Sequence, residues 1–199
     1  MLSRFPFVFL IPFAFVGNSA PLVAEETATA RSEPLIREAR GLIKSYAGQL
    51  KAALAQAIKT DGPIAAIEVC SHKSPQIAHN LSEKSAWTIG RTSLKLRNPA
   101  SAPDDWERAV LQDFEKRRRA GEDPKTIDHA EWGADGTFRY MKAIPTQEMC
   151  LACHGANLRP DVRRQLAEYY PEDQATGYDI GMIRGAFTLR RGISPQAKE

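Results

Sequence analysis

The sequence predicts an α+β domain in which helices flank a small antiparallel sheet, with a long helix on the N-terminal side. Residues 34–58 carry apolar side chains three and four positions apart, which is the spacing of an amphipathic helix. Residues 87–94 and 182–190 are rich in β-branched and aromatic side chains, which favours strands. Residues 131–141 place a glycine-containing turn between two strand-like segments, which predicts a hairpin.

The other predicted helices follow from breaking and capping residues. Asp61-Gly62-Pro63 ends the first helix, and a short helix then ends at Cys70. Ser101 is the predicted N-cap of a longer helix that ends at Gly121. The basic run at the end of that helix suits the helix dipole, so we interpret it as a solvated helix end. Two further helices are predicted over residues 74–81 and 160–169.

Length and composition exclude several classes of protein. The 199 residues fit one ordinary domain. A hydrophobic content of 43% is too high for general disorder. The net charge of +3 is too small for a strongly cationic nucleic-acid binder. Three cysteines exclude a scaffold built on several disulfides, and their odd number leaves one thiol to explain.

The N-terminal segment has the pattern of an export signal. Residues 1–24 combine a short basic start at Arg4, an apolar run over residues 5–16 and a region of small residues, so we expect a signal peptide cleaved after Ala24. The apolar run is shorter than the roughly 20 residues that span a bilayer, although an uncleaved segment would tether the chain to the membrane. We expect a flexible leader over residues 25–33 and a tail over residues 193–199.

One motif carries the chemistry. Cys150-Leu151-Ala152-Cys153-His154 is C-x-x-C-H, the attachment sequence of c-type haem. Two thiols on one helical turn, Cys150 and Cys153, suit the two vinyl groups of one haem, and His154 then becomes the proximal iron ligand. About 0.0009 matches are expected by chance from this composition. The export signal supports the same cofactor, because c-type haem is attached outside the cytoplasm.

Two other sites would use the same cysteines. A Cys150–Cys153 redox pair of the thioredoxin type fits the spacing, although the motif lies late in the chain for that class. A zinc site would combine the pair with Cys70 and His72, although C-x-H is tighter than the usual ligand spacing. Neither alternative explains why His154 directly follows Cys153.

A haem bound through His154 leaves the sixth iron position open. Cys70 is attractive because it is the odd thiol and ends an apolar stretch, although it is equally well read as a small buried hydrophobic residue. The residues themselves therefore leave the sixth ligand open. The candidates are Cys70, His72, His79, His129, Met141, Met149 and Met182.

Several segments together resemble an exported family of c-type haem proteins with a PAS-like fold, typified by a cyanobacterial haem protein with a cysteine axial ligand. The matching segments occur in family order and cover nearly all of residues 35–190. One departure is Ser101, where the family commonly has Asn. The resemblance implies one PAS-like, haem-binding domain over residues 34–192, with iron bound by His154 and Cys70. The segments are residues 66–70 with Pro75, 90–95 with 97–99, 103–107, 150–155, 170–175, 177–178 and 185–186.

Such a site favours redox function over catalysis. An anionic thiolate ligand stabilises ferric iron, and filled axial positions leave no ready access for peroxide, so we expect no enzyme. Arg91 and Arg97 are candidates to neutralise the thiolate or a haem propionate, with a surface position as the alternative. No nucleic acid is expected as a partner.

We expect a periplasmic redox or small-ligand sensor that needs a redox or signalling protein as its partner. The alternative is a soluble electron-transfer cytochrome c. A four-helix gas-binding haem protein is disfavoured by the predicted strands.

Overall fold

The computed structural model describes residues 20–192, with side chains from residue 29 onward. Its centre is a four-stranded antiparallel sheet in the order β1-β4-β3-β2, which confirms the α+β class. The predicted tail lies outside the described residues, as do residues 1–19 of the predicted signal peptide. The strands are β1 (Thr88–Thr92), β2 (Asp128–Trp132), β3 (Phe138–Pro145) and β4 (Ile183–Arg191).

Helix α1 (Ala20–Asp61) contains the predicted helix over residues 34–58 but begins earlier. The expectation that residues 25–33 have little structure is therefore wrong. The segment is rich in helix-favouring residues. The last residue of β2 also contacts it, because Trp132 Nε1 donates to Ser32 Oγ at 2.9 Å. Arg31 also stacks 3.8 Å from the centre of the Trp132 ring. Among the described residues, we find no helix with the length and apolarity needed to cross a membrane.

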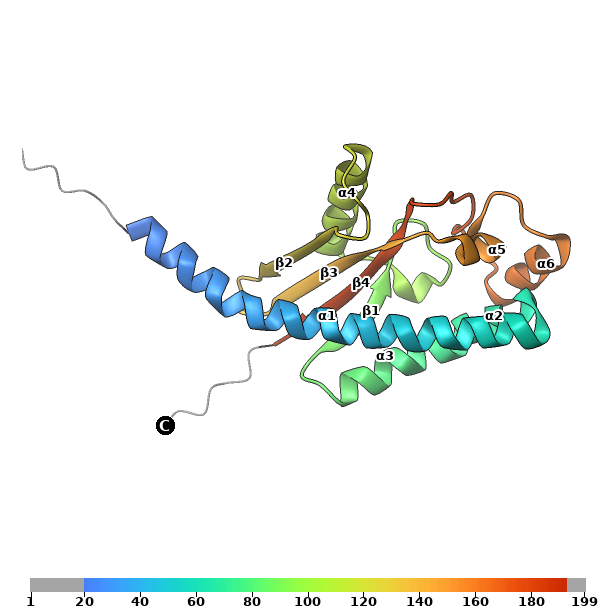
Figure 1. Cartoon of the computed structure of the whole chain (residues 1–199), viewed down its shortest axis with the longest axis horizontal. Helices are drawn as coiled ribbons and strands as arrows, with labels where there is room; N and C mark the ends of the chain where they lie inside the picture. The colour runs from blue at the N-terminus through green and yellow to red at the C-terminus, as the bar shows by residue number, and fades with distance from the viewer. Residues whose placement is uncertain (1–19, 193–199) are drawn as a thin grey trace, which may run out of the picture.

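The main core lies between the sheet and two helices, α1 and α3 (Ser74–Glu83). Tyr46 of α1 meets Phe187 of β4 edge to face, with ring centroids 5.2 Å apart. Trp87 and Phe138 also belong to this core and meet edge to face, with ring centroids 6.0 Å apart. Figure 1 shows α1 running along the whole length of the sheet.

The opposite face of the sheet is covered by α4 (Asp105–Arg119). The predicted cap at Ser101 is wrong, because Ser101 belongs to a separate 3₁₀ turn and the helix begins after Asp104. Asp104 accepts from the Glu107 backbone N–H, and the Glu107 carboxylate accepts from that of Asp104. This reciprocal capping box satisfies two backbone donors that a start at Ser101 would leave unpaired. The helix buries Val110, Leu111 and Phe114 against the sheet.

Cys70 lies inside a continuous helical run rather than at the end of a helix. The run consists of α2 (Pro63–Glu68), a π-helical turn η1 (Val69–Lys73) and α3. The Ser74 N–H donates to the Val69 carbonyl five residues earlier, which is the hydrogen bond of a π-helix. The predicted end at Cys70 is wrong because no glycine or proline interrupts the backbone there. π turns are frequently found at functional sites.

A smaller core lies beyond the end of the sheet, between α2 and α6 (Pro160–Tyr169). Ile67 packs there against Val162, Leu166 and Tyr170, and Cys153 packs against its edge. The C-x-x-C-H motif forms a 3₁₀ turn, η3 (Glu148–Cys150), followed by the short helix α5 (Leu151–His154). Figure 1 shows α2, α5 and α6 together at one end of the molecule.

Candidate functional site

The C-x-x-C-H motif is held in a single helical turn by the residue that follows it. A Cβ on Gly155 would lie 2.7 Å from the Leu151 carbonyl oxygen, so only glycine allows the chain to leave the turn this closely. All three cysteines are free thiols, and Cys153 Sγ lies 4.0 Å from the Pro63 carbonyl oxygen of α2. The turn therefore presents Cys150, Cys153 and His154 from one short rigid element.

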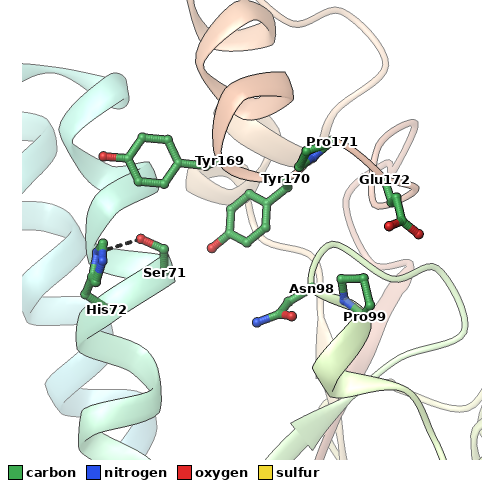
Figure 2. Close-up of a pocket in the computed structure, with 8 residues that line it drawn as sticks. All are labelled: Ser71, His72, Asn98, Pro99, Tyr169, Tyr170, Pro171 and Glu172. Carbon is green, nitrogen blue, oxygen red and sulfur yellow. Dashed lines mark hydrogen bonds between the residues drawn. The ribbon is translucent and has the colours of Figure 1, made fainter.

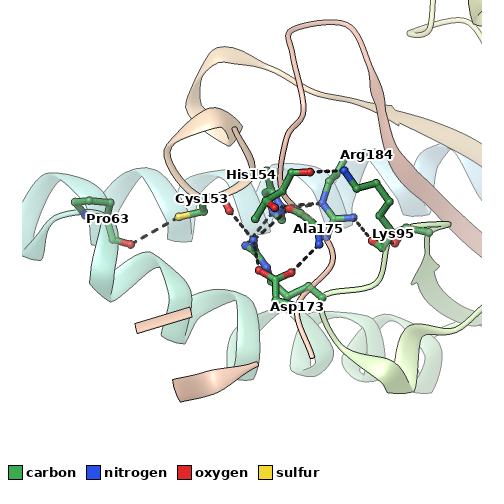
Figure 3. A network of polar contacts seen from close by, with 10 residues as sticks. Pro63, Lys95, Cys153, His154, Asp173, Ala175 and Arg184 are labelled. Carbon is green, nitrogen blue, oxygen red and sulfur yellow. Dashed lines mark hydrogen bonds and ion pairs between the residues drawn. The ribbon is translucent and has the colours of Figure 1, made fainter. Parts of the chain in front are cut away.

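Residues 173–178, here called the strap, fix the orientation of His154. The Tyr178 N–H donates to the His154 carbonyl at 2.9 Å, and the Gly177 N–H donates to the Gly155 carbonyl at 3.1 Å. The ring nitrogen Nδ1 of His154 lies 2.7 Å from the carbonyl oxygen of Ala175. Figure 3 shows His154 beside Ala175 and Arg184.

This contact determines which ring nitrogen of His154 carries the proton. A carbonyl oxygen only accepts, so Nδ1 is the protonated nitrogen and Nε2 keeps its lone pair. The nitrogens nearest to Nε2 belong to Arg97 and Arg184, both at 3.4 Å, which is long for a hydrogen bond. Burial, and then the charges of Arg184 and Arg97, hold the pKa of His154 well below its usual value. The ring is therefore neutral, with a free nitrogen, which is the form that binds a metal.

Arg97 connects three segments around that ring. Its guanidinium is buried and forms an ion pair with Asp173 at 2.9 Å. The same Nη2 donates to the carbonyls of Cys153 at 2.5 Å and Ala175 at 3.3 Å. The predicted residue Arg97 thus lies directly at the site and joins the motif to the strap. Its Nε atom is buried and has no partner among the described residues.

Arg184 of β4 also lies at the site, and the sequence analysis missed it. Its Nε lies 3.0 Å from His154 Nδ1, and its Nη1 donates to the Lys95 carbonyl at 3.5 Å. The guanidinium also lies over the Tyr178 ring, 5.5 Å from its centre. Desolvation and the charges of nearby arginines lower the pKa of Arg184. An arginine inside a strand pattern gave no signal that it would turn toward the motif.

The predicted residue Arg91 of β1 contacts Ser74, the residue that follows the π turn. It donates to the Ser74 hydroxyl at 2.5 Å, and that hydroxyl also shares a hydrogen bond with the Tyr46 hydroxyl at 2.9 Å. This contact holds the start of α3 against α1 and β1. Arg91 is therefore close to Cys70 but does not touch His154 in the described contacts.

Cys70 lies in the same electrostatic environment as the motif. Burial raises the pKa of the Cys70 thiol, and the charges of Arg91, Arg97 and Arg184 oppose that rise. The charge on Cys70 also interacts with Cys150, and it raises the pKa of Cys153. The fold therefore brings all three cysteines to one end of the molecule, although Cys70 is 80 positions away from Cys150 in the sequence.

Two pockets flank the π turn. One of about 370 Å³ lies between Ser71 and His72 on one side and Asn98 and Pro99 on the other, with Tyr170 above them (Figure 2). Its Ser71 directly follows Cys70, and its Asn98 directly follows Arg97. A second pocket of about 580 Å³ lies between the end of α1 and the run from α2 to α3. The first volume is in the range of small-molecule sites.

The other candidate ligands have different environments. Met141 is completely buried in the core under α4, and His129 contacts Glu131 on the sheet surface. His72 contacts Ser71 and the edge of the Tyr169 ring, and His79 is exposed. Within the described part of the chain, no group of three or more His, Cys, Asp or Glu side chains could hold a metal ion, so the four zinc ligands are not brought together.

Comparisons with known proteins give one family and one structure. The model of the Tll0287-like family matches residues 20–191. The solved structure of the cyanobacterial heme-protein Tll0287 superposes with a TM-score of 0.60 and 22% sequence identity, covering 80% of this chain and 98% of that chain. No curated protein matches the sequence. The structural match supports the fold described above.

Proposed function

The chain belongs to the Tll0287-like family, and from that premise we propose that it is an exported redox protein with one covalently bound haem c. The related solved structure is a heme-protein. The observation that carries the proposal is His154: a neutral ring at the end of C-x-x-C-H, with Nδ1 2.7 Å from the Ala175 carbonyl oxygen and with Nε2 contacted only by long approaches of Arg97 and Arg184 at 3.4 Å in the described residues. Iron-binding histidines are commonly oriented by such a hydrogen bond.

The donor set of this end of the molecule fits that group. Cys150 and Cys153 would carry the thioether bonds, and His154 would be the proximal ligand. When bound, haem supplies reversible one-electron chemistry. Arg97 holds the motif and the strap together, which keeps the His154 ring in one orientation. Ser71, Asn98 and Tyr170 line an adjoining pocket of about 370 Å³ on the side of Cys70.

We assign Cys70 as the distal ligand. Of the candidates with described side chains, it combines a π turn with the charges of three arginines, which partly offset the rise in the thiol pKa that burial causes. Two filled axial positions would leave no ready site for peroxide, so the protein is not expected to be an enzyme. A thiolate that dissociates on reduction would make a redox or small-ligand sensor, and a retained thiolate would make an electron carrier.

The proposal is tested by producing the full chain in a host that attaches c-type haem. We expect a haem stain after denaturing electrophoresis and its loss in the Cys150→Ala/Cys153→Ala variant. Cys70→Ala should keep the stain but change the ferric spectrum, whereas the neighbouring His72→Ala should change neither. A chain without haem would disprove the proposal, and an unchanged Cys70→Ala spectrum would disprove the distal ligand.

Two further measurements separate the remaining alternatives. Potentiometry with and without carbon monoxide distinguishes a sensor, which exchanges its ligand on reduction, from a carrier, which cycles unchanged. We also propose a periplasmic location, based on the signal pattern of residues 1–24. Mass spectrometry of the mature chain should find the cleavage after Ala24, and an uncleaved, membrane-associated chain would contradict it.

A further inference from the structure

The candidate site has more positive charges than negative ones. Three arginines interact electrostatically with Cys70: Arg91, Arg97 and Arg184. Asp173 forms an ion pair with Arg97. In the part of the chain that the structure describes, no carboxylate forms an ion pair with Arg91 or Arg184. Arg91 and Arg184 are half-buried, where a cation without a carboxylate partner is less well solvated than at the surface, so this surplus indicates a site for an anion.

Arg184 has the least suitable partners of the three arginines. Its Nε–H lies 3.0 Å from His154 Nδ1, the nitrogen that also lies 2.7 Å from the Ala175 carbonyl oxygen. Nδ1 accepts from Arg184 only in the tautomer that gives up the hydrogen bond to Ala175, so the contact to Arg184 competes with a shorter one. Its other polar contacts are a long one to the Lys95 carbonyl at 3.5 Å, one to His154 Nε2 at 3.4 Å and one to the Tyr178 hydroxyl, and none of these is a carboxylate. A guanidinium placed in this way is available to a stronger acceptor.

The backbone holds Arg184 in this place. Arg184 precedes Gly185, where a Cβ would lie 2.4 Å from the Thr92 carbonyl oxygen and 2.8 Å from Ser93 Cβ. The absence of a side chain lets the end of β1 lie directly against β4. The position of Arg184 beside His154 is therefore set by the sheet and does not depend on a flexible loop.

We propose that Arg184 is a carboxylate-binding residue of this site. The planar guanidinium fork matches a carboxylate with two parallel hydrogen bonds. This inference rests on the proposed function, under which the carboxylate is a haem propionate. Arg97 is committed to Asp173, so its role is to position the motif, whereas Arg184 is the arginine free to bind the cofactor.

The test compares Arg184→Gln and Arg184→Lys with Arg139→Gln, which removes an equal charge that is paired with Asp104 and Glu107 at the start of α4. All three haem-loaded variants should keep the wild-type ratio of haem to chain. Arg184→Gln should shift the ferric-to-ferrous ratio at fixed potential by about tenfold, which is about 59 mV for a one-electron couple, toward a lower potential. Arg184→Lys should keep most of the potential, because it keeps the charge.

A vibrational measurement distinguishes binding from a general charge effect. The propionate bending band in the resonance Raman spectrum should move in Arg184→Gln and Arg184→Lys and stay in place in Arg139→Gln. A band and a potential that are the same in Arg184→Gln and Arg139→Gln would overturn the inference.

A chain that carries no haem would defeat the proposed function but not yet this inference. In that case inorganic phosphate is titrated into the same full-length chain at constant ionic strength. Binding at Arg184 should raise the Tm by about 3–5 °C for each tenfold increase in phosphate above its Kd, and Arg184→Gln should abolish the rise. A phosphate effect that is absent or equal in both chains would overturn the inference.

Discussion

The two ends of the molecule differ in how many of their arginines form ion pairs with carboxylates. The frame, meaning the sheet with α1, α3 and α4, pairs its arginines with carboxylates at several places. Arg40 lies 2.8 Å from Asp128, and Arg139 lies 2.6 Å from Asp104. Arg117 lies 2.6 Å from Glu122, and Arg191 pairs with Glu38. The pairs of Arg40, Arg139 and Arg191 join α1 and α4 to the sheet, and the pair of Arg117 joins α4 to the loop that follows it.

The site end, meaning α2, η1, α5, α6, the strap and the loops beside them, differs in this respect. It has three arginines around Cys70 and His154 with one paired carboxylate. The large hydrophobic side chains that are exposed in the described residues also lie at this end: Ile64, Leu94, Tyr169 and Ile180. The comparison teaches that the frame is satisfied by its own residues, whereas the site end has the chemistry of a surface for an anionic and partly apolar group.

The largest effect is expected from removing Asp173, the carboxylate that pairs with the buried Arg97 at the site end. Asp173→Asn leaves Arg97 buried without its partner, which should cost about 3–5 kcal/mol of unfolding free energy. Asp104→Asn, at the more exposed Arg139 pair of the frame, should cost about 1 kcal/mol or less. Denaturant unfolding of the two variants measures both. Equal losses would show that the Arg97–Asp173 pair is an ordinary surface ion pair.

A smaller effect, but with opposite signs at the two ends, is expected from removing one arginine. In the haem-free full chain, Arg184→Met removes a half-buried cation that has no carboxylate partner and should stabilise the fold by about 1 kcal/mol. Arg40→Met removes a partner of Asp128 and Tyr140 and should destabilise it by about 1 kcal/mol. Chemical denaturation gives both values. A loss of stability in Arg184→Met would contradict the charge surplus.

The smallest effect concerns the pH dependence of the frame. Burial opposes ionisation of Asp128, but hydrogen bonds from Tyr140 and Arg40 prevail and lower the pKa of its carboxyl from 3.8. A lowered pKa stabilises the fold at neutral pH, and this contribution disappears as the pH falls below about 4. Asp128→Asn should therefore reduce stability at pH 7 and flatten the decline between about pH 4 and pH 2. A decline as steep as in the wild type would exclude Asp128 as a cause.

The frame could largely be predicted from the sequence because its signals are local. Apolar periodicity located α1, capping and breaking residues located α4, and β-branched runs and a glycine turn located the strands. The predictions were wrong where contacts between residues far apart in the sequence determine the start of a helix. Trp132 supports the helix at residues 31–32, and Glu107 selects Asp104 as the cap.

The site could be predicted only in part. The C-x-x-C-H motif identified Cys150, Cys153 and His154 because its spacing is itself the signal. Arg97 was proposed and lies against the motif. Arg184 and Asp173 were missed, because one lies in a strand and the other in a loop, and only the tertiary fold brings them to His154. The π turn was missed as well, since no residue type marks it.

The π turn contains one residue more than an α-helical turn, and this extra residue sets the direction in which the Cys70 side chain points. Successive residues of an α-helix are rotated by about 100° around its axis. Deleting one residue between Val69 and Lys73 would convert the run from α2 to α3 into an uninterrupted α-helix and turn Cys70 away by about that angle relative to α3. A deletion of one residue here would thus keep the surrounding helices and point the Cys70 sulfur in another direction. The length of this turn therefore controls whether Cys70 faces the candidate site.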